Sequence, residues 1–400
     1  MNIILFDDNS RYSLLPFSHT RPVADIRCGI MTMRERWEYF TGSPTGTLTA
    51  PYLQEVFPLN GGGDNLFING SIIATADLFA AISKLEPMQQ LVQDDLIIAA
   101  RVTDAEVQFG PGLNTPVSLK EVNYAAPIHR LQHIWDIFSM NEEAITADFA
   151  IITKDRTSQP MPEGVIVKNP DNLFIEEGAI INAGCIINAE GPVYIGKGAE
   201  ILEGALIRGP LALREHAVVK MGAKLYKGTT IGPGCKVGGE ISNVVFFANS
   251  NKAHDGYLGN SVIGEWCNLG ADTNCSNLKN NYDTIKIWDE HNFKSVQTGL
   301  IFCGLMMGDH SKCGINTMFN TGTVVGVSAN IYGGSFPEKF IPSFTWGGSE
   351  GLTGYRLERA LETANRMMQR RGKTLSAEEI KMYTHIYERT QEQRDMFANK

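Results

Sequence analysis

Aliphatic residues recur at every sixth position through the middle of the chain. The first long run consists of Ile195, Ile201, Ile207, Leu213, Val219, Leu225, Ile231 and Val237. A later run consists of Ile301, Met307, Cys313, Phe319, Val325 and Ile331, and a short early run of Ile175, Ile181 and Ile187. A small residue often stands four places after the aliphatic one, and glycine often follows it directly. This period fits neither a helix nor a simple two-residue alternation.

A six-residue period predicts one flat side of a triangular coil. The aliphatic residue points inward, and the small residue allows the chain to turn at the corner. Three such steps make a coil of about 18 residues. Residues 164–334 are therefore expected to form a left-handed parallel β-helix of roughly eight coils, an exception to the usual right-handed crossover. Because each coil buries its core only against its neighbours and flat outer faces are usually covered, we expect a homotrimer.

The N-terminal residues 1–154 follow a different pattern. Strands are predicted at 2–7, 65–69 and 95–100, and helices at 28–40, 71–85 and 127–140. This alternation predicts an α/β domain with a mostly parallel sheet, whose ligands gather at the carboxyl ends of the strands. Residues 155–163 are the predicted linker.

Residues 335–400 are predicted to be a helical extension. Leu357, Leu361, Ala364 and Met368 recur at helical spacing, and Gly372 ends that helix. Ser376 and Glu379 form a predicted capping box for a last helix that reaches about residue 397. These helices either cap the prism or contribute to a coenzyme A site.

Composition narrows the classes of function. A net charge of −9 and a pI of about 5.5 argue against a nucleic-acid partner. No apolar stretch is long enough to span a membrane, and the first residues do not resemble a signal peptide. The seven cysteines include no C-x-x-C pair, so we expect reduced, packed thiols in a cytoplasmic protein.

The repeat is irregular between Val237 and Ile263, and that break carries His254 and Tyr257. Asn277 lies 23 residues after His254, slightly more than one coil, so the two can lie on adjacent rungs. Acetyl transfer to an amine needs a base, and histidine suits that task. It also needs donors for the thioester oxyanion, which amide groups can supply.

The string His254-Asp-Gly-Tyr257-Leu-Gly259-Asn260, followed by Ile263-Gly-Glu-Trp-Cys-Asn-Leu-Gly270-Ala-Asp272-Thr, resembles a known family. It is similar to the acetyltransferase domain of bifunctional UDP-N-acetylglucosamine pyrophosphorylase/glucosamine-1-phosphate N-acetyltransferases, especially their archaeal branch. The resemblance implies acetyl-CoA as co-substrate and His254 as general base. It implies that Tyr257 and Asn277 bind the sugar phosphate or steady the reacting groups.

The same resemblance nominates Lys252, Lys279 and Lys286 as substrate-binding residues, the last two as phosphate contacts. Asp272 departs from the family, which has glycine there. This carboxylate either weakens the binding of an anionic ligand or faces solvent.

The N-terminal domain resembles a divergent sugar nucleotidyltransferase. It retains Leu15-Pro16-Phe-Ser-His-Thr20-Arg21-Pro22, but the usual glycine-rich loop is replaced by Asp7-Asp8-Asn-Ser-Arg11, and Ser71 stands where a metal-binding aspartate is usual. Arginine binds phosphate well, so Arg11, Arg21 and Arg27 are the predicted nucleotide-binding residues. Asp7 or Asp8 is the predicted ligand of Mg²⁺, which usually needs only one or two carboxylates.

Several functions remain open at this point. The first is a bifunctional enzyme that acetylates glucosamine 1-phosphate and then joins the product to UTP. The alternatives are an acetyltransferase with a non-catalytic nucleotide-binding domain, a glucose-1-phosphate thymidylyltransferase-like enzyme, a γ-type carbonic anhydrase and an inactive structural β-helix. The prism contains His216, His254, His291 and His310 without a closely spaced pair, which disfavours the zinc enzyme.

Overall fold

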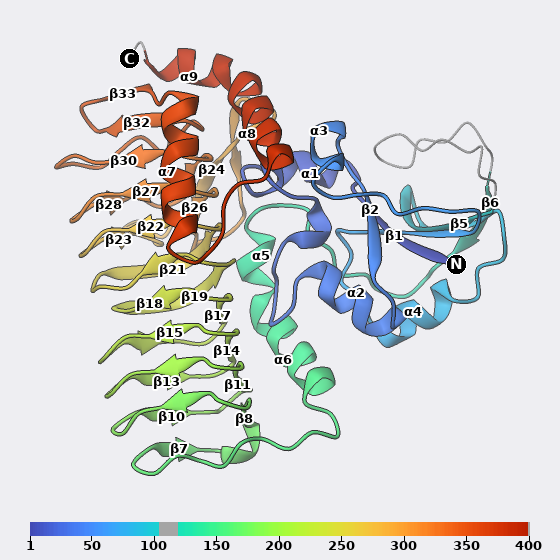
Figure 1. The fold of residues 1–400 in the computed structure, drawn as a ribbon, viewed down its shortest axis with the longest axis horizontal. Coiled ribbons are helices and arrows are strands. Elements are labelled where there is room, and N and C mark those ends of the chain that lie inside the picture. The colour runs from blue at the N-terminus through green and yellow to red at the C-terminus, as the bar shows by residue number, and fades with distance from the viewer. Residues whose placement is uncertain (104–118, 399–400) are drawn as a thin grey trace. The chain divides into compact units, whose positions relative to one another are not determined.

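The computed structural model describes residues 1–103 and 119–398, which form two compact units (Figure 1). The first comprises Met1–Ile26 and Met31–Ile134, and the second comprises Arg27–Ile30 and Trp135–Lys400. Within the described ranges, no helix combines the length and the apolar character needed to cross a membrane.

The first unit is built on a mixed sheet with strand order β2-β1-β3-β5-β4-β6. Its strands are β1 Asn2–Phe6, β2 Thr45–Leu48, β3 Asn65–Asn69, β4 Gln89–Gln93, β5 Leu96–Val102 and β6 Lys120–Asn123. Its helices are α1 Ser10–Ser13, α2 Met33–Thr41, α3 Pro51–Gln54 and α4 Ala76–Ile82, with 3₁₀ turns at Phe17–His19 and Val23–Asp25. The first three strands are parallel, and β5 runs antiparallel to β3 and β4.

Both faces of this sheet are buried, which is why β1 is apolar at consecutive positions. Ile3 and Leu5 pack with Trp37 of α2, whereas Ile4 and Phe6 belong to the cluster on the other face. The helix predicted at 127–140 is largely absent. Backbone bonds Ile73 N–His129 O and Leu131 N–Ser71 O hold this segment extended, and only α5, Asp136–Ser139, is helical.

The second unit contains the predicted left-handed parallel β-helix, with about ten turns. Figure 1 shows its strands stacked as successive rungs. One path is β7 Ile166–Lys168, β10 Ile186–Asn188, β13 Leu206–Arg208, β16 Lys224–Leu225, β19 Glu240–Phe246, β21 Tyr257–Ile263, β26 Leu305–Met307, β29 Thr323–Val325 and β31 Phe340–Ile341. Joined to it are β8 Leu173–Ile175, β11 Val193–Ile195, β14 Leu211–Leu213 and β17 Thr229–Ile231.

A second path of rungs forms another side of the prism. It is β9 Ile180–Ile181, β12 Glu200–Ile201, β15 Val218–Val219, β18 Lys236–Val237, β20 Asn251–Lys252, β22 Asn268–Leu269, β27 Lys312–Cys313, β30 Asn330–Ile331, β32 Thr345–Gly348 and β33 Gly351–Gly354. In addition, β23 Asn274–Cys275 pairs with β28 Met318–Phe319, and β24 Lys286–Asp289 forms a hairpin with β25 Lys294–Gln297. Parallel rungs continue beyond residue 334, through β31 and β32.

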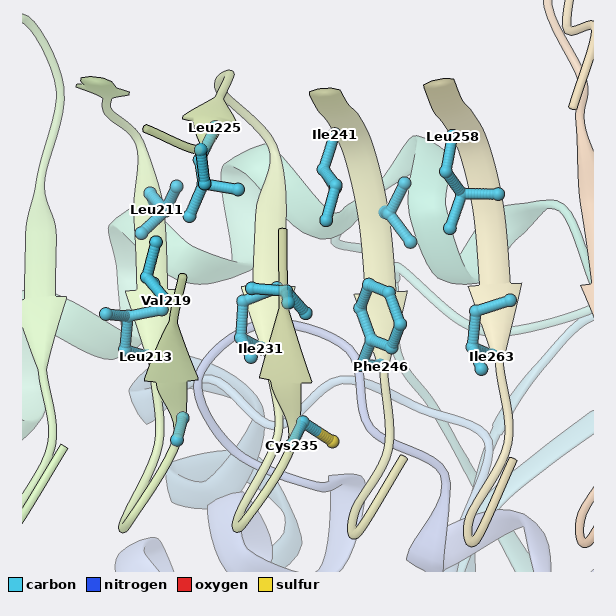
Figure 2. Close-up of a cluster of buried hydrophobic side chains, with 14 of the residues drawn as sticks. Leu211, Leu213, Val219, Leu225, Ile231, Cys235, Ile241, Phe246, Leu258 and Ile263 are labelled. Carbon is cyan, nitrogen blue, oxygen red and sulfur yellow. The ribbon is translucent and has the colours of Figure 1, made fainter. Parts of the chain in front are cut away.

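Hydrophobic side chains fill the prism, as Figure 2 shows for Leu213 and Ile231 of the repeat and for Phe246 and Ile263. Each fully buried aliphatic side chain contributes about 1.5–3 kcal/mol relative to an exposed one. Ile301 is the exception in the later run. It is 44% exposed, because it ends the insertion between β23 and β26 rather than lying on a rung.

One side of the prism is covered within this unit. Helix α6, Asn141–Ile152, and Ile30 pack on Phe174, Tyr194 and Ala212, which face outward from their rungs and are nevertheless buried. All seven cysteines lie within the described residues, and each is a buried thiol. Burial raises the pKa of Cys235 and Cys303 to about 12, so these thiols pack rather than react.

The C-terminal helices are α7 Leu357–Gln369, α8 Ala377–Arg389 and α9 Gln391–Ala398. The predicted capping box is confirmed, because Glu379 N donates to Ser376 Oγ and Ser376 N donates to Glu379 Oε2. The predicted last helix is divided at Thr390, after which α9 begins. Gly372 follows α7 with a φ of +68°, a conformation typical of helix ends.

Candidate active sites

A cavity of about 910 Å³ lies against the second path of rungs. Its cationic lining residues are Lys220, Lys236, Lys312, Arg370 and Arg371. Its apolar lining includes Trp266, Leu269, Ile315 and Met367. Among the described residues that line it, none is an aspartate or glutamate. The cavity therefore combines a positive charge with apolar walls, which suits a long ligand that carries phosphates.

The floor of the cavity follows from strand pairing. Lys236 pairs with Asn251, Asn251 with Asn268, and Asn268 with Lys312, so four polar residues form one outward row. Successive residues of a strand point to opposite faces, so the neighbours of this row point into the prism. Lys312 Nζ donates to His310 O at 2.6 Å, and burial lowers the pKa of Lys312 to about 8.

The wall of the cavity comes from α7 and the residues after it. Arg371 Nη1 donates to Gly234 O at 2.6 Å and to Asn249 Oδ1 at 3.0 Å. The guanidinium carbon of Arg371 and Lys373 Nζ lie 5.8 and 6.0 Å from the centre of the Trp266 ring. The C-terminal extension thus contributes to a candidate coenzyme site, one of the two roles considered for it.

His254 lies in the loop between β20 and β21, and its exposed side chain lines the cavity. Among the described residues, none hydrogen-bonds the imidazole. Lys252 lies below this loop and is fully buried, so it does not line the cavity. Its Nζ donates to His254 O at 2.5 Å and to Asp255 O at 2.8 Å, and burial lowers its pKa to about 8.

Tyr257 and Asn277 come together at a corner of the prism. Asn260, with a φ of +47°, turns that corner, a conformation that asparagine tolerates well. Asn277 Nδ2 donates to Asn260 Oδ1 at 2.7 Å and to the Tyr257 hydroxyl at 3.0 Å. Burial raises the pKa of Tyr257. Neither Tyr257 nor Asn277 is among the residues that line the cavity beside His254.

The two lysines of the insertion also lie outside the cavity lining. Lys279 Nζ donates to Thr284 O at 2.7 Å, and Lys286 is exposed at the start of β24. Asp272 is exposed at a turn with a φ of +54°, which explains why glycine suits this position in the family.

The first unit has a smaller pocket of about 360 Å³, at the carboxyl ends of β1 and β3. Its lining residues are Phe6, Asp8, Asn9, Asn69, Asp95, Leu96, Ile97 and Arg130. Asp8 accepts hydrogen bonds from Ser10 N and Asn69 Nδ2, both at 2.9 Å, and lies 3.5 Å from Arg130 Nη1. The location matches the rule that ligands of such sheets bind where parallel strands end.

Asp7 and Arg11 are built into the fold of this unit rather than into its pocket. The fully buried carboxylate of Asp7 accepts from Val23 N at 2.8 Å, Thr49 Oγ1 at 2.5 Å and Arg11 Nε at 3.3 Å. Burial raises the pKa of Asp7. Arg11 Nη2 donates to Ser18 O and to the Tyr52 hydroxyl.

The other nominated arginines also lie outside the pocket lining. Arg21 is buried, and Arg27 belongs to the second unit, where its Nη1 donates to Ile30 O. Of the five residues nominated in the N-terminal domain, the structure places Asp8 in the pocket. Arg130 was missed, because its approach to Asp8 depends on the Ile72–Arg130 bridge between distant segments.

The pocket is compatible with Mg²⁺ on the chemistry of its donors. Asp8 and Asp95 supply two carboxylates, and Mg²⁺ usually binds through one or two carboxylates plus substrate phosphates. No group of three or more His, Cys, Asp or Glu side chains that could hold a metal ion occurs in residues 1–103 and 119–398.

Comparison with known proteins gives one matching family and several similar proteins. Residues 3–157 match the family described as sugar nucleotidyl transferase. The chain is 31% identical to the bifunctional protein GlmU of Methanocaldococcus jannaschii, covering 53% of this chain and 45% of that protein. It is 31% identical to the bifunctional sugar-1-phosphate nucleotidylyltransferase/acetyltransferase of Sulfurisphaera tokodaii, covering 41% of each. The GlmU of Bartonella quintana is 25% identical, covering 69% of this chain and 55% of that protein.

The chain thus spans about half, or less, of the length of these relatives. Among solved structures, the Francisella novicida UDP-N-acetylglucosamine acyltransferase is 12% identical with a TM-score of 0.27, covering 57% of this chain and 87% of that one.

The fold and the match to a known family together define the class of protein. A domain that matches the sugar nucleotidyl transferase family precedes a left-handed parallel β-helix with C-terminal helices. The chain is similar to bifunctional proteins of the GlmU kind, in line with the resemblance of its motifs.

Proposed function

We propose that the β-helix transfers the acetyl group of acetyl-CoA to the amine of glucosamine 1-phosphate. The observation that carries this proposal is the His254 side chain on a cavity whose charged lining residues are lysines and arginines. The bifunctional relatives, one of which is named a sugar-1-phosphate nucleotidylyltransferase/acetyltransferase, add support.

The cavity offers what each part of acetyl-CoA requires. Lys236, Lys312 and Arg370 can bind its phosphates, because charge-assisted hydrogen bonds to phosphate are among the strongest. Trp266 and Met367 supply apolar surface for the pantetheine arm. His254 takes a proton from the sugar ammonium and releases it to solvent, and the freed amine attacks the thioester carbonyl. A C–N bond forms and the C–S bond breaks, while His254 takes a second proton from the attacking nitrogen and passes it to the departing thiolate.

The test is acetyl-CoA consumption in the presence of glucosamine 1-phosphate. His254→Ala should lower the rate by about 10²–10⁴-fold, the range that a general base contributes. Calorimetry should show that the variant still binds acetyl-CoA, because the cations of the cavity remain. Unchanged acetyl transfer by His254→Ala would refute the assignment of His254 as general base, and absence of acetyl transfer in the wild type would favour a structural role for the prism.

We propose nucleotidyl transfer for the pocket of the first unit, with N-acetylglucosamine 1-phosphate and UTP as substrates. The pair Asp8 and Asp95 could hold Mg²⁺, which supplies charge neutralisation for phosphates when bound. Arg130 would orient a phosphate by paired hydrogen bonds. The family match over residues 3–157 supports this proposal.

Pyrophosphate release from UTP, with and without EDTA, tests it, and Asp8→Asn should abolish the Mg²⁺-dependent reaction. Release of pyrophosphate from dTTP in the presence of glucose 1-phosphate would instead favour the thymidylyltransferase-like alternative. Acetyl transfer without release of pyrophosphate from either nucleotide would indicate an acetyltransferase with a non-catalytic N-terminal domain.

For assembly we propose a homotrimer in the cytoplasm. Ile166, Ile186 and Leu206 form an outward row along β7, β10 and β13, and each is at least 40% exposed. Such a contiguous apolar row on an otherwise soluble chain suits contact with another copy. Light scattering should give a mass in solution of three times the 44.0 kDa chain mass. Leu206→Glu should lower this mass in solution.

A further inference from the structure

A lysine interrupts an otherwise apolar inward row of the prism. Along this row Ile201 pairs with Val219, Val219 with Val237, and Val237 with Lys252. All four side chains are fully buried. An ammonium at such a position loses its hydration and destabilises the core unless it is well hydrogen-bonded.

The ammonium is directed at the loop between β20 and β21. Lys252 Nζ donates to the carbonyl oxygens of His254 and Asp255, two consecutive residues of that loop. The next residue, Gly256, has a φ of +112°, and a Cβ there would lie 2.2 Å from Thr273 O. The loop is therefore held from below by Lys252 and closely packed against the following rung.

The imidazole of His254 has no such support of its own. It is exposed and makes no hydrogen bond to the described residues, so the backbone beneath it determines where it lies over the cavity. We infer that Lys252 is a positioning residue for His254, holding the loop carbonyls so that the imidazole faces the cavity. This inference deepens the acetyl transfer proposed above and depends on it.

A lysine is a poor choice for stability at this position. Methionine has nearly the same length and no charge, and buried polar groups are often replaced by apolar ones without loss of stability. The carbonyls that Lys252 binds belong to exposed residues, so water can satisfy them in its absence. A residue that departs from the apolar pattern of its row without a gain in stability is expected at a functional site.

Lys252→Met tests the inference in the full-length protein. We expect an undiminished melting temperature, an unchanged KM for acetyl-CoA and a kcat lowered by about 10²-fold, the effect of a catalytic group misplaced by about 1 Å. Backbone amides of residues 254–257 should exchange hydrogen faster than in the wild type, with no change elsewhere in the prism.

Ile201→Met is the matched control, because it places methionine in the same row three rungs away. It should leave kcat and the exchange of residues 254–257 unchanged. An unchanged kcat in Lys252→Met would overturn the inference. So would a fall in kcat and melting temperature without faster local exchange, which indicates a purely structural role.

If the wild-type protein does not consume acetyl-CoA with glucosamine 1-phosphate, the proposed function fails. The exchange comparison still decides whether Lys252 holds the His254 loop, so the two failures remain distinguishable.

Discussion

Around the cavity of the β-helix, cations line the space where a ligand would lie, whereas in the first unit several arginines are part of the fold. Lys236 and Lys312 stand in an outward row on the cavity floor. Arg11 is buried beside Asp7 and bonded to Ser18 and Tyr52. The pocket of the first unit takes its only lining cation among the described residues, Arg130, from a distant segment.

The contrast shows how architecture determines what a charged residue does. In a β-helix each outward position reaches the surface unless another element covers it, so a lysine there is available to a ligand. In an α/β domain both sheet faces are covered, so a charge near the first strand is easily enclosed. Charge reversals and deletions should therefore affect ligand binding in one unit and stability in the other.

Asp7→Ala should have the largest effect on stability. Removal of this carboxylate leaves the Arg11 guanidinium buried without its ion-pair partner, which costs about 3–5 kcal/mol of unfolding free energy. Denaturant unfolding of the full-length protein measures this loss, with the fluorescence of Trp37 and the other tryptophans as the signal.

Asp8→Ala is the matched control for this prediction. Its carboxylate is partly exposed in the pocket, so we expect a loss of only about 1 kcal/mol, together with loss of nucleotidyl transfer. Equal destabilisation by the two substitutions would contradict the distinction between the buried and the pocket-facing carboxylate.

Lys236→Glu should raise the KM for acetyl-CoA with little change in stability. A hydrogen bond to a charged group contributes about 1.5–3 kcal/mol, so we expect an increase of about tenfold to hundredfold. Initial rates at varied acetyl-CoA measure it.

Lys224→Glu makes the same change in net charge on β16, outside the cavity lining. The KM of Lys224→Glu for acetyl-CoA should stay at the wild-type value. A similar rise for both variants would mean that net charge, rather than the row on the cavity floor, attracts the ligand.

The prism could be predicted because its period is a local property of the chain. Ile201, Val219 and Val237 repeat at fixed intervals, and each interval corresponds to one coil. His254 could be located for the same reason, since an interruption of a regular pattern is visible in sequence. Ile301 shows the limit of this method: its spacing fits the repeat, yet an insertion removes it from the rungs.

Residues brought together from distant segments could not be predicted. Arg370 and Arg371 line the cavity because α7 packs along the prism, and no spacing in the sequence indicates this. Lys252 was predicted to bind substrate, whereas it lies in the inward row and its Nζ donates to His254 O. In the first unit, sequence proximity grouped Asp7 with Asp8, although adjacent residues of an extended chain point in opposite directions.

A further predicted effect concerns how the stability of Lys252→Met relative to the wild type changes with pH. Burial lowers the folded pKa of Lys252 to about 8 from 10.5, and Asp255, Cys313 and Asp272 are the titratable groups that act on it. Between these values the unfolded chain holds the proton that the folded chain has lost, so wild-type stability rises with pH. Lys252→Met has no titrating amine at this position. Its stability relative to the wild type should therefore fall as the pH rises, by at most about 1.4 kcal/mol per pH unit. Denaturant unfolding from pH 8 to 10 measures the change. Ile201→Met should keep a constant difference from wild type, and the same constancy in Lys252→Met would show that Lys252 keeps its proton in the folded protein.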